Sequence, residues 1–185
     1  QGEMDMVDVA WALLSGEQDT LVRKLIPEDV SWEYLRFLGA PLWISSPSTL
    51  RQVAERLSRS QFKKSKDPTQ CALLYLCLDK RTVLAAMFKA VKNDSLHKFF
   101  SRDFTEERHR VAALKNACTL LSQHRYPLAA AFFLLAGKFG DALDTVLNRM
   151  GESMLALFVM RLYAKGDSGP LYDDAVARVM DTWRK

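Results

Sequence analysis

The chain has 185 residues, 49% of them hydrophobic and 26% charged, and its formal net charge is +4. The hydrophobic fraction is sufficient for a folded core and excludes a disordered chain, while the length fits one compact domain or a segment of a repeat array. The positive charge is too small for a dedicated nucleic-acid-binding protein, and no apolar run reaches the length of a membrane span. Because the sequence opens at Gln1 without a signal-peptide pattern, we expect an excised piece of a longer cytosolic protein.

Helix signals recur along the first half of the chain, and no segment shows the sustained alternation of a strand. Ser46-Pro47 and Asp67-Pro68 each place a capping side chain directly before a proline, which is a favourable start for a helix. Earlier helices are predicted over residues 5–14, 19–26 and 31–39. Tight turns are predicted at residues 137–140 and at residues 79–81, the latter leading into a helix that carries Val83, Leu84, Met87, Phe88 and Val91. This half of the chain therefore reads as short helices separated by turns.

A run of cations occupies the segment between these two proline starts. Its members are Arg56, Arg59, Lys63, Lys64 and Lys66. The run suits contact with an acidic partner helix, an anionic membrane surface or RNA, but cations at a helix end also simply complement the helix dipole. We interpret residues 57–68 as a basic linker, with a candidate sub-boundary near 60–67. These five cations are the partner-binding residues that we predict.

The most informative segment is residues 129–135, which read as a helix that is apolar on every side. Such a helix must be covered by protein all round, because it is too short to cross a bilayer. A preceding helix begins near Thr105 and is predicted to bury one face. That face carries Val111, Leu114, Ala117, Cys118 and Leu121. Further helices are predicted at residues 97–100, with the aromatic side chains turned inward, and over residues 142–150, 154–165 and 171–183.

The residues that could carry chemistry are scattered. The cysteines are Cys71, Cys77 and Cys118, and the histidines are His97, His109 and His124. The odd cysteine count and the lack of a framework spacing favour buried free thiols in a reducing compartment. No histidine pairs with another ligand at metal-binding spacing, and nucleophile and phosphate-loop motifs are missing. We therefore predict no catalytic residues, no metal site and no cofactor.

The tryptophans Trp11, Trp32 and Trp43 occur where the predicted helices begin or turn. Such residues serve either as anchors at protein interfaces or as pegs that fix the packing of helices. For Trp11, which lies between apolar neighbours, we favour the second role. The sequence leaves the choice open for Trp43.

The pattern as a whole predicts an all-α fold, in which residues 1–185 form one segment of an α-solenoid. Helices of roughly 10–15 residues that follow one another through short turns are typical of stacked antiparallel helical hairpins. A compact helical bundle is the alternative. Stacking is favoured because the predicted hairpins follow one another without a long crossover.

Several short blocks, distributed in order along nearly the whole chain, resemble one known family. The blocks are residues 6–13, Trp32 with Leu38-Gly39 and Trp43, Asp67-Pro68 with residues 71–73, Phe104 with Glu106-Glu107, and residues 112–117, 130–135 and 155–156. They resemble the helical region of DmX-like proteins, called rabconnectin alpha in animals, which are large subunits of the RAVE complex. The most specific part is residues 113–117 together with residues 131–135.

The resemblance implies an α-solenoid that follows β-propellers and acts as a non-enzymatic scaffold in the reassembly of the vacuolar proton-pumping ATPase (V-ATPase). The implied partners are V-ATPase peripheral-sector subunits and other RAVE-type subunits, without nucleic acid or a transmembrane segment. The implied location is cytoplasmic and peripheral to endomembranes, reached through those partners. An α-solenoid of a vesicle-coat or tethering complex is the alternative function, because it shares the same hairpin packing. A third hypothesis, RNA or DNA binding, rests on the basic run alone.

Overall fold

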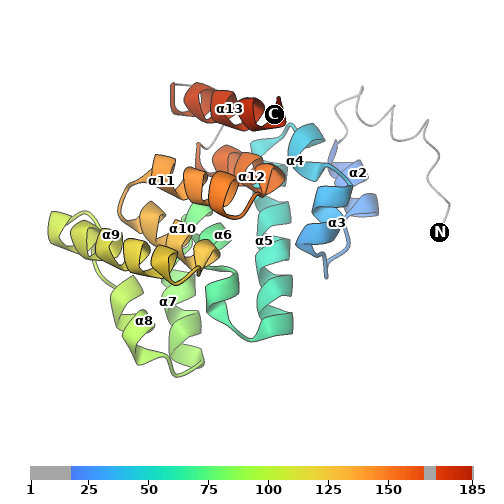
Figure 1. The fold of residues 1–185 in the computed structure, drawn as a ribbon. Coiled ribbons are helices and arrows are strands. Elements are labelled where there is room, and N and C mark those ends of the chain that lie inside the picture. The colour runs from blue at the N-terminus through green and yellow to red at the C-terminus, as the bar shows by residue number, and fades with distance from the viewer. Residues whose placement is uncertain (1–17, 165–169, 185) are drawn as a thin grey trace.

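The computed structural model describes residues 18–164 and 170–184, and within these ranges the regular structure is all helical, with no strands. The prediction of an all-α fold is thereby confirmed for the described part of the chain. The helix predicted over residues 5–14, with Trp11, lies outside the described residues. Figure 1 shows the succession of helices from α2 to α13.

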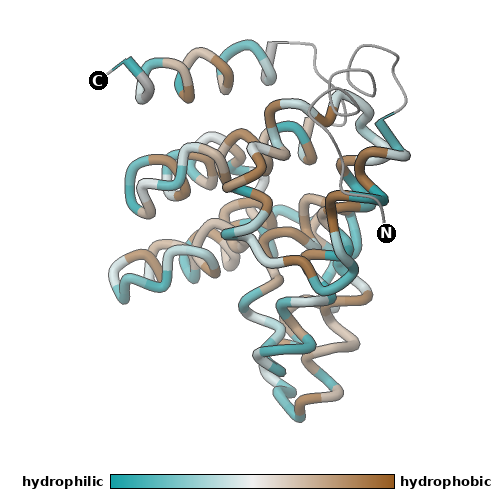
Figure 2. Tube along the Cα trace, turned by 90° about the vertical axis from the view of Figure 1, so that its right-hand side faces the viewer, coloured by the Kyte–Doolittle hydropathy of each residue, from teal (hydrophilic) through white to brown (hydrophobic). Residues whose placement is uncertain are grey.

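The helices lie close to their predicted positions. In chain order they are α2 (Gln18–Leu25), α3 (Trp32–Phe37), α4 (Ala40–Trp43), α5 (Pro47–Ser65), the 3-10 helix η1 (Pro68–Gln70), α6 (Ala72–Cys77), α7 (Arg81–Ala90), α8 (Asp94–Phe100), α9 (Glu107–Ser122), α10 (Tyr126–Leu135), α11 (Phe139–Asp144), the π-helix η2 (Thr145–Arg149), α12 (Ser153–Tyr163) and α13 (Pro170–Trp183). The short helix α4 and the π-helical turn η2 were not predicted. Along the outer helices, hydrophilic and hydrophobic residues alternate with the turns, as helices with one buried face require (Figure 2).

The helix starts follow the expected capping chemistry. The Ser46 hydroxyl accepts a hydrogen bond from the backbone N–H of Thr49 at 3.3 Å, and α5 begins at the next residue, Pro47. The Asp67 carboxylate accepts one from the backbone N–H of Thr69 at 2.9 Å, but this start opens the 3-10 turn η1 before α6 forms. These local side-chain contacts satisfy backbone donors that a helix start leaves unpaired.

The interpretation of residues 57–68 as a linker is wrong for most of that segment, because α5 continues without interruption to Ser65. Lys63 and Lys64 lie in its last turn, where positive charge complements the helix dipole. Lys66 then adopts a left-handed conformation, and its N–H donates to the carbonyl oxygen of Phe62 at 2.8 Å, which ends the helix. The sub-boundary near 60–67 stays a prediction.

Four connections between successive helices share one turn geometry. In each, a residue with φ between 58° and 71° follows the first helix, and these residues are Asp79, Lys92, His124 and Gly137. The next residue closes a Schellman bond back into the helix, for example from the N–H of Asn93 to the carbonyl oxygen of Phe88 at 2.9 Å. Each turn therefore reverses the chain within a few residues. The turns at Asp79 and Gly137 were predicted from the sequence, whereas those at Lys92 and His124 were not.

This geometry gives a test in which one substitution type has opposite effects at two sites. Lys92→Gly is expected to raise the free energy of unfolding by about 0.5–1 kcal/mol, because glycine removes the strain of positive φ at an exposed turn residue. Lys89→Gly, three residues earlier inside α7, is expected to lower it by about 1 kcal/mol. Urea unfolding of both variants measures the difference, and a loss of stability in Lys92→Gly would contradict the assignment of the turn.

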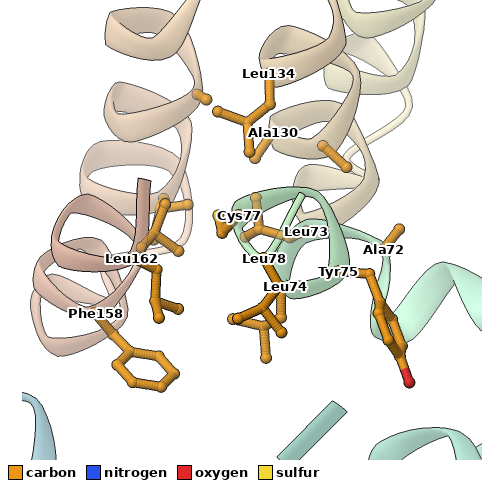
Figure 3. Close-up of a cluster of buried hydrophobic side chains, with 14 of the residues drawn as sticks. Ala72, Leu73, Leu74, Tyr75, Cys77, Leu78, Ala130, Leu134, Phe158 and Leu162 are labelled. Atoms are coloured by element: carbon orange, nitrogen blue, oxygen red, sulfur yellow. The ribbon is translucent and has the colours of Figure 1, made fainter. Parts of the chain in front are cut away.

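The predicted apolar helix is the centre of the core. All side chains of α10 from Leu128 to Leu135 are buried, and α10 contacts α9, α6, α11 and η2. Figure 3 shows Ala130 and Leu134 of α10 next to the buried side chains of α6. Phe158 and Leu162 of α12 lie to the left of the α6 side chains in this view. The prediction that this helix is covered all round is confirmed.

The inward face predicted for α9 is partly wrong. The structure buries Ala113, Ala117 and Leu120, whereas Val111 is 43% exposed and Cys118 is exposed. The cause is that α9 packs mainly along α10, and small alanines allow the two helices to approach closely on a narrow face. The predicted short helix before α9 is confirmed as α8. Its Phe99 and Phe100 are turned inward and pack against Phe132 of α10, at ring-centroid distances of 5.1 and 5.5 Å.

One half-buried side chain joins α5 to α6 and to α12 through hydrogen bonds. The guanidinium of Arg51, on α5, donates to the carbonyl oxygens of Cys77 at 3.4 Å, Leu78 at 2.8 Å and Leu162 at 3.3 Å. These carbonyl groups lie at the C-terminal ends of α6 and α12, where a helix leaves acceptors unpaired. Arg51 therefore fixes both helix ends to α5.

Candidate functional site

The predicted partner-binding residues lie on the C-terminal half of α5 and its cap. Two of them contact the turn that follows α2. Arg56 Nε lies 3.4 Å from Glu28 Oε1, and Lys63 Nζ lies 2.9 Å from Asp29 Oδ2. Both acidic residues belong to the same turn, so the cations join α5 to the N-terminal part of the described chain (Figure 1).

A third cation of the run is also paired within the chain. Arg59 forms an ion pair with Glu55, one turn earlier on α5, and Glu55 also accepts a hydrogen bond from Lys80 Nζ at 2.6 Å. The pKa of the Glu55 carboxyl is lowered, chiefly by that hydrogen bond from Lys80, so the group stays ionised near neutral pH. This arrangement neutralises part of the charge that the sequence suggested for partner contact.

The remaining two cations, Lys64 and Lys66, form no ion pair with any acidic side chain of the described residues. Lys64 faces a groove between the start of α3, the end of α5 and η1. We call it the Trp32 groove, and its lining residues are Val30, Ser31, Trp32, Glu33, Ser60, Gln61, Lys64, Ser65, Asp67 and Gln70. It has a volume of about 460 Å³, within the range of pockets that hold ligands or short peptide segments.

Contacts with α12 and within α3 hold the residues that line the Trp32 groove in place. The Trp32 indole stacks on the Phe158 ring of α12, with centroids 5.7 Å apart and an angle of 30° between the planes. Ser31 caps α3 by accepting a hydrogen bond from the N–H of Tyr34 at 3.3 Å. The pKa of Glu33 is lowered, first by a backbone hydrogen bond and then by Ser31, Arg36 and Lys64, so a carboxylate lies at the rim.

Three of the residues that line this groove each carry a buried polar atom with no hydrogen-bond partner among the described residues. These atoms are Trp32 Nε1, Ser60 Oγ and Gln61 Oε1. Ser60 is 2% exposed, although a serine at mid-helix normally bonds the preceding turn or water. Ser58, two residues earlier, shows the usual arrangement, because its hydroxyl donates to the carbonyl oxygen of Ala54 at 2.8 Å. No local sequence pattern joins these residues, because Trp32 lies on α3 whereas Ser60 and Gln61 lie on α5.

The histidines do not meet. His97 Nδ1 lies 2.9 Å from the carbonyl oxygen of Ala85, and His109 Nδ1 lies 2.6 Å from that of Asp103. The third, His124, contacts the hydroxyl of its neighbour Tyr126 at 2.5 Å. Within residues 18–164 and 170–184 no group of three or more metal-ligand side chains comes together. Each imidazole ring therefore contacts a different group, and the three rings form no common site among the described residues.

The cysteines divide into two environments. Cys71 and Cys77 are buried, and burial raises the pKa of each thiol to about 12, so both behave as small apolar side chains. Cys118 is exposed on α9, and the expectation that all three thiols are buried is wrong at this position. The predicted inward face of α9 is wrong at Cys118 because only a narrow face of this helix packs against the core.

Fold and site together define an all-helical module with a polar groove and an adjoining surface of largely paired charges. No helix in the part that the structure describes has the length and apolarity needed to span a membrane. The family described as RAVE protein 1 C terminal matches residues 1–180, and the chain belongs to this family. The resemblance stated above on sequence blocks is thereby confirmed.

Three relatives show the same membership. Human DmX-like protein 1 is 37% identical over 157 residues, which is 83% of this chain and 5% of that protein. Regulator of V-ATPase in vacuolar membrane protein 1 of Saccharomyces cerevisiae is 34% identical over 181 residues, 95% of this chain and 13% of that protein. Its counterpart in Schizosaccharomyces pombe is 31% identical over 172 residues, 88% of this chain and 13% of that protein. The chain thus spans a small part of the length of its relatives.

Proposed function

We propose that this chain is a non-enzymatic scaffold segment of a RAVE-type complex, which promotes assembly and reassembly of the V-ATPase through protein–protein binding. The observation that carries the proposal is the 34% identity, over 95% of the chain, to a yeast protein named as a regulator of the V-ATPase in the vacuolar membrane. The family match over residues 1–180 agrees with this identity. Homology supports the role in V-ATPase regulation, and the scaffold mechanism is our proposal.

The proposed architecture is an α-solenoid segment of stacked helical hairpins. Neighbouring helices in sequence pack on each other, with α9 on α10, α7 on α8 and α12 on α13. The shared turn geometry of the four connections supports a repeating mode of chain reversal. A stack of this kind leaves outer helix faces for partners, which is what a scaffold requires.

The proposed partners are subunits of the V-ATPase peripheral sector and other subunits of a RAVE-type complex. Contact with them would hold the chain at the cytoplasmic side of endomembranes without a membrane span of its own. The cations Lys64 and Lys66 are the members of the basic run most suited to such contact, because Arg56, Arg59 and Lys63 already pair within the chain.

The test is capture of the purified V-ATPase peripheral sector by this chain, with charge reversal in the basic run. Lys64→Glu with Lys66→Glu is expected to weaken binding about three- to tenfold, and less at high salt, because exposed charges at the edge of an interface contribute modestly and are screened. Lys89→Glu with Lys92→Glu, exposed on and after α7, is the matched control.

The further reversal of Lys63 separates an internal role from a partner role, because Lys63 pairs with Asp29. If binding survives reversal of Lys63, Lys64 and Lys66, the basic run is not the contact. Capture of coat or tethering subunits instead of the peripheral sector would favour the alternative trafficking function. Failure of the wild-type chain to bind the peripheral sector and other RAVE-type subunits would contradict the proposed scaffold role.

A further inference from the structure

We propose that the outer side of α9 is a docking surface for an acidic, amphipathic α-helix of a partner polypeptide. The partner helix lies along an apolar stripe that the core leaves partly uncovered, with its acidic side chains beside the cations of α9. The inference rests on the proposed function only for the identity of the partner.

The apolar side chains in question follow one another along α9, and we call them the α9 stripe. The α9 stripe consists of Val111, Leu114, Cys118 and Leu121. Intervals of three, four and three residues place its members along one side of the helix, next to the side that packs on α10. Val111 is 43% exposed, Cys118 is exposed, and the two leucines are half-buried. The α9 stripe is therefore apolar surface that the fold leaves partly open.

A groove lies beside the first half of the α9 stripe, between α9 and the turn that follows α10. Its lining residues are Glu107, Arg110, Val111, Leu114, Ala136, Gly137 and Lys138. Its volume is about 510 Å³, so it can receive the side chains that one helix inserts between those of another. Because α9 lies at the edge of the molecule in the view of Figure 1, a second helix can approach along its length.

The charges around the α9 stripe are nearly all positive. Residues 108–140 contain five Lys and Arg residues and no Asp or Glu. By helix geometry, Arg110 and Lys115 flank the α9 stripe on opposite sides, and Lys138 lines the groove. None of these three cations forms an ion pair with an acidic side chain of the described residues. Acidic side chains of a partner can therefore pair with them, although Glu107 adds one negative charge to the groove lining.

These features favour an acidic helix over other occupants of the surface. Spacing of three and four residues is the pattern by which one helix recognises another. A second copy of this chain that paired α9 with α9 would bring like charges together. An anionic membrane would attract the cations, but the α9 stripe has none of the aromatic side chains that helices at a membrane surface insert. A nucleic acid would leave the apolar side chains against a charged backbone.

The first test selects binders on the full chain. The probe is a displayed library of helical peptides with a fixed apolar seam, in which the positions flanking the seam vary among Glu, Gln and Lys. Selected peptides are expected to carry Glu at the flanking positions, because these meet Arg110, Lys115 and Lys138 in the docked complex. Recovery of no binder, or of binders with Lys at these positions, would overturn the proposal.

The second test measures the affinity of the selected peptides for a variant of the α9 stripe. Val111→Asp is expected to weaken binding about tenfold or more, because a negative charge replaces an apolar contact beside acidic side chains. Val83→Asp is the matched control, since Val83 is 44% exposed on α7, and it is expected to leave the affinity unchanged. Equal affinities of the two variants would show that the peptides do not dock on the α9 stripe.

Charge exchange tests the ionic contacts separately. Lys115→Glu is expected to weaken binding of the acidic peptides about three- to tenfold at low salt, and less at high salt. Peptides with Lys at one flank are expected to regain affinity for this variant. Lys89→Glu, also exposed but on α7, is the matched control. If Lys115→Glu and Lys89→Glu bind the acidic peptides equally well, the cations of α9 are not the contact and the proposal fails.

Binding of the purified V-ATPase peripheral sector separates this proposal from the proposed function. If the peptides depend on Val111 and Lys115 but do not compete with the sector, the docking surface stands and the partner assignment fails. If neither the peptides nor the sector distinguish Val111→Asp and Lys115→Glu from the wild type, the docking surface fails and the proposed function stands. Binding to phosphatidylserine vesicles, or a dimer of the chain, that is lost in both variants while the peptides are unaffected would assign the surface to a membrane or a second copy and overturn the proposal.

Discussion

Phe158→Ala is expected to lower the free energy of unfolding by about 3–5 kcal/mol, the cost of removing a large aromatic side chain from a packed core. Phe158 is fully buried on α12, close to Leu162 and to the side chains of α6. Its ring also stacks on Trp32, so its loss leaves a cavity beneath the Trp32 groove. Because a domain of this size is stable by only about 5–15 kcal/mol, the variant should be close to unfolding.

Denaturant unfolding followed by circular dichroism measures this effect. Phe37→Ala provides the matched control, because Phe37 is 85% exposed on α3 and its loss is expected to change stability by less than about 0.5 kcal/mol. The groove is also expected to change in Phe158→Ala, seen as a shift of the Trp32 indole resonance. Equal effects of the two substitutions would contradict the placement of Phe158 in the core.

Features that depend on local sequence could be predicted. The apolar run of α10 permits only a fully covered helix, because it has no polar face to present to water. The start of α5 was recognisable because Ser46 and Pro47 act within one turn of chain. The inward aromatic residues of α8 followed from the same pattern of apolar side chains. In each case the physical cause lies within a few residues of the feature that it determines.

Features that depend on tertiary contact could not be predicted. The left-handed turns at Lys92 and His124 join helices that pack on each other, and neither residue marks a turn in the sequence. The exposure of Cys118 depends on which face of α9 meets α10, and its apolar pattern allowed two neighbouring faces. Pattern alone did not distinguish them.

In the candidate site, too, local features could be predicted and tertiary contacts could not. The sequence identified the basic run, but it did not show that Arg56 and Lys63 face the acidic turn after α2. The pairs are exposed or half-exposed, so they contribute little to stability, yet they reduce the charge that a partner would meet. The Trp32 groove combines residues about 30 positions apart, which no local pattern joins.

Arg51→Met is expected to lower the free energy of unfolding by about 2–4 kcal/mol, because it leaves the carbonyl groups of Cys77, Leu78 and Leu162 without their shared donor. Methionine keeps much of the length and apolar stem of the side chain, so the loss reflects hydrogen bonds and charge more than packing. The positive charge also lies at two helix C-termini, where it interacts favourably with both helix dipoles.

The matched control is Arg108→Met, because Arg108 is 75% exposed and its ion pair with Glu106 lies at the surface. Its effect is expected to stay within about 0.5 kcal/mol. Arg51→Lys should fall between the two variants, since lysine keeps the charge but lacks the planar fork that reaches several carbonyl groups at once. In Arg51→Met, exchange of backbone amide hydrogens should accelerate most at the C-terminal turns of α6 and α12. If Arg51→Met is no less stable than Arg108→Met, these helix ends are satisfied by other groups, and Arg51 does not join α6 and α12 to α5.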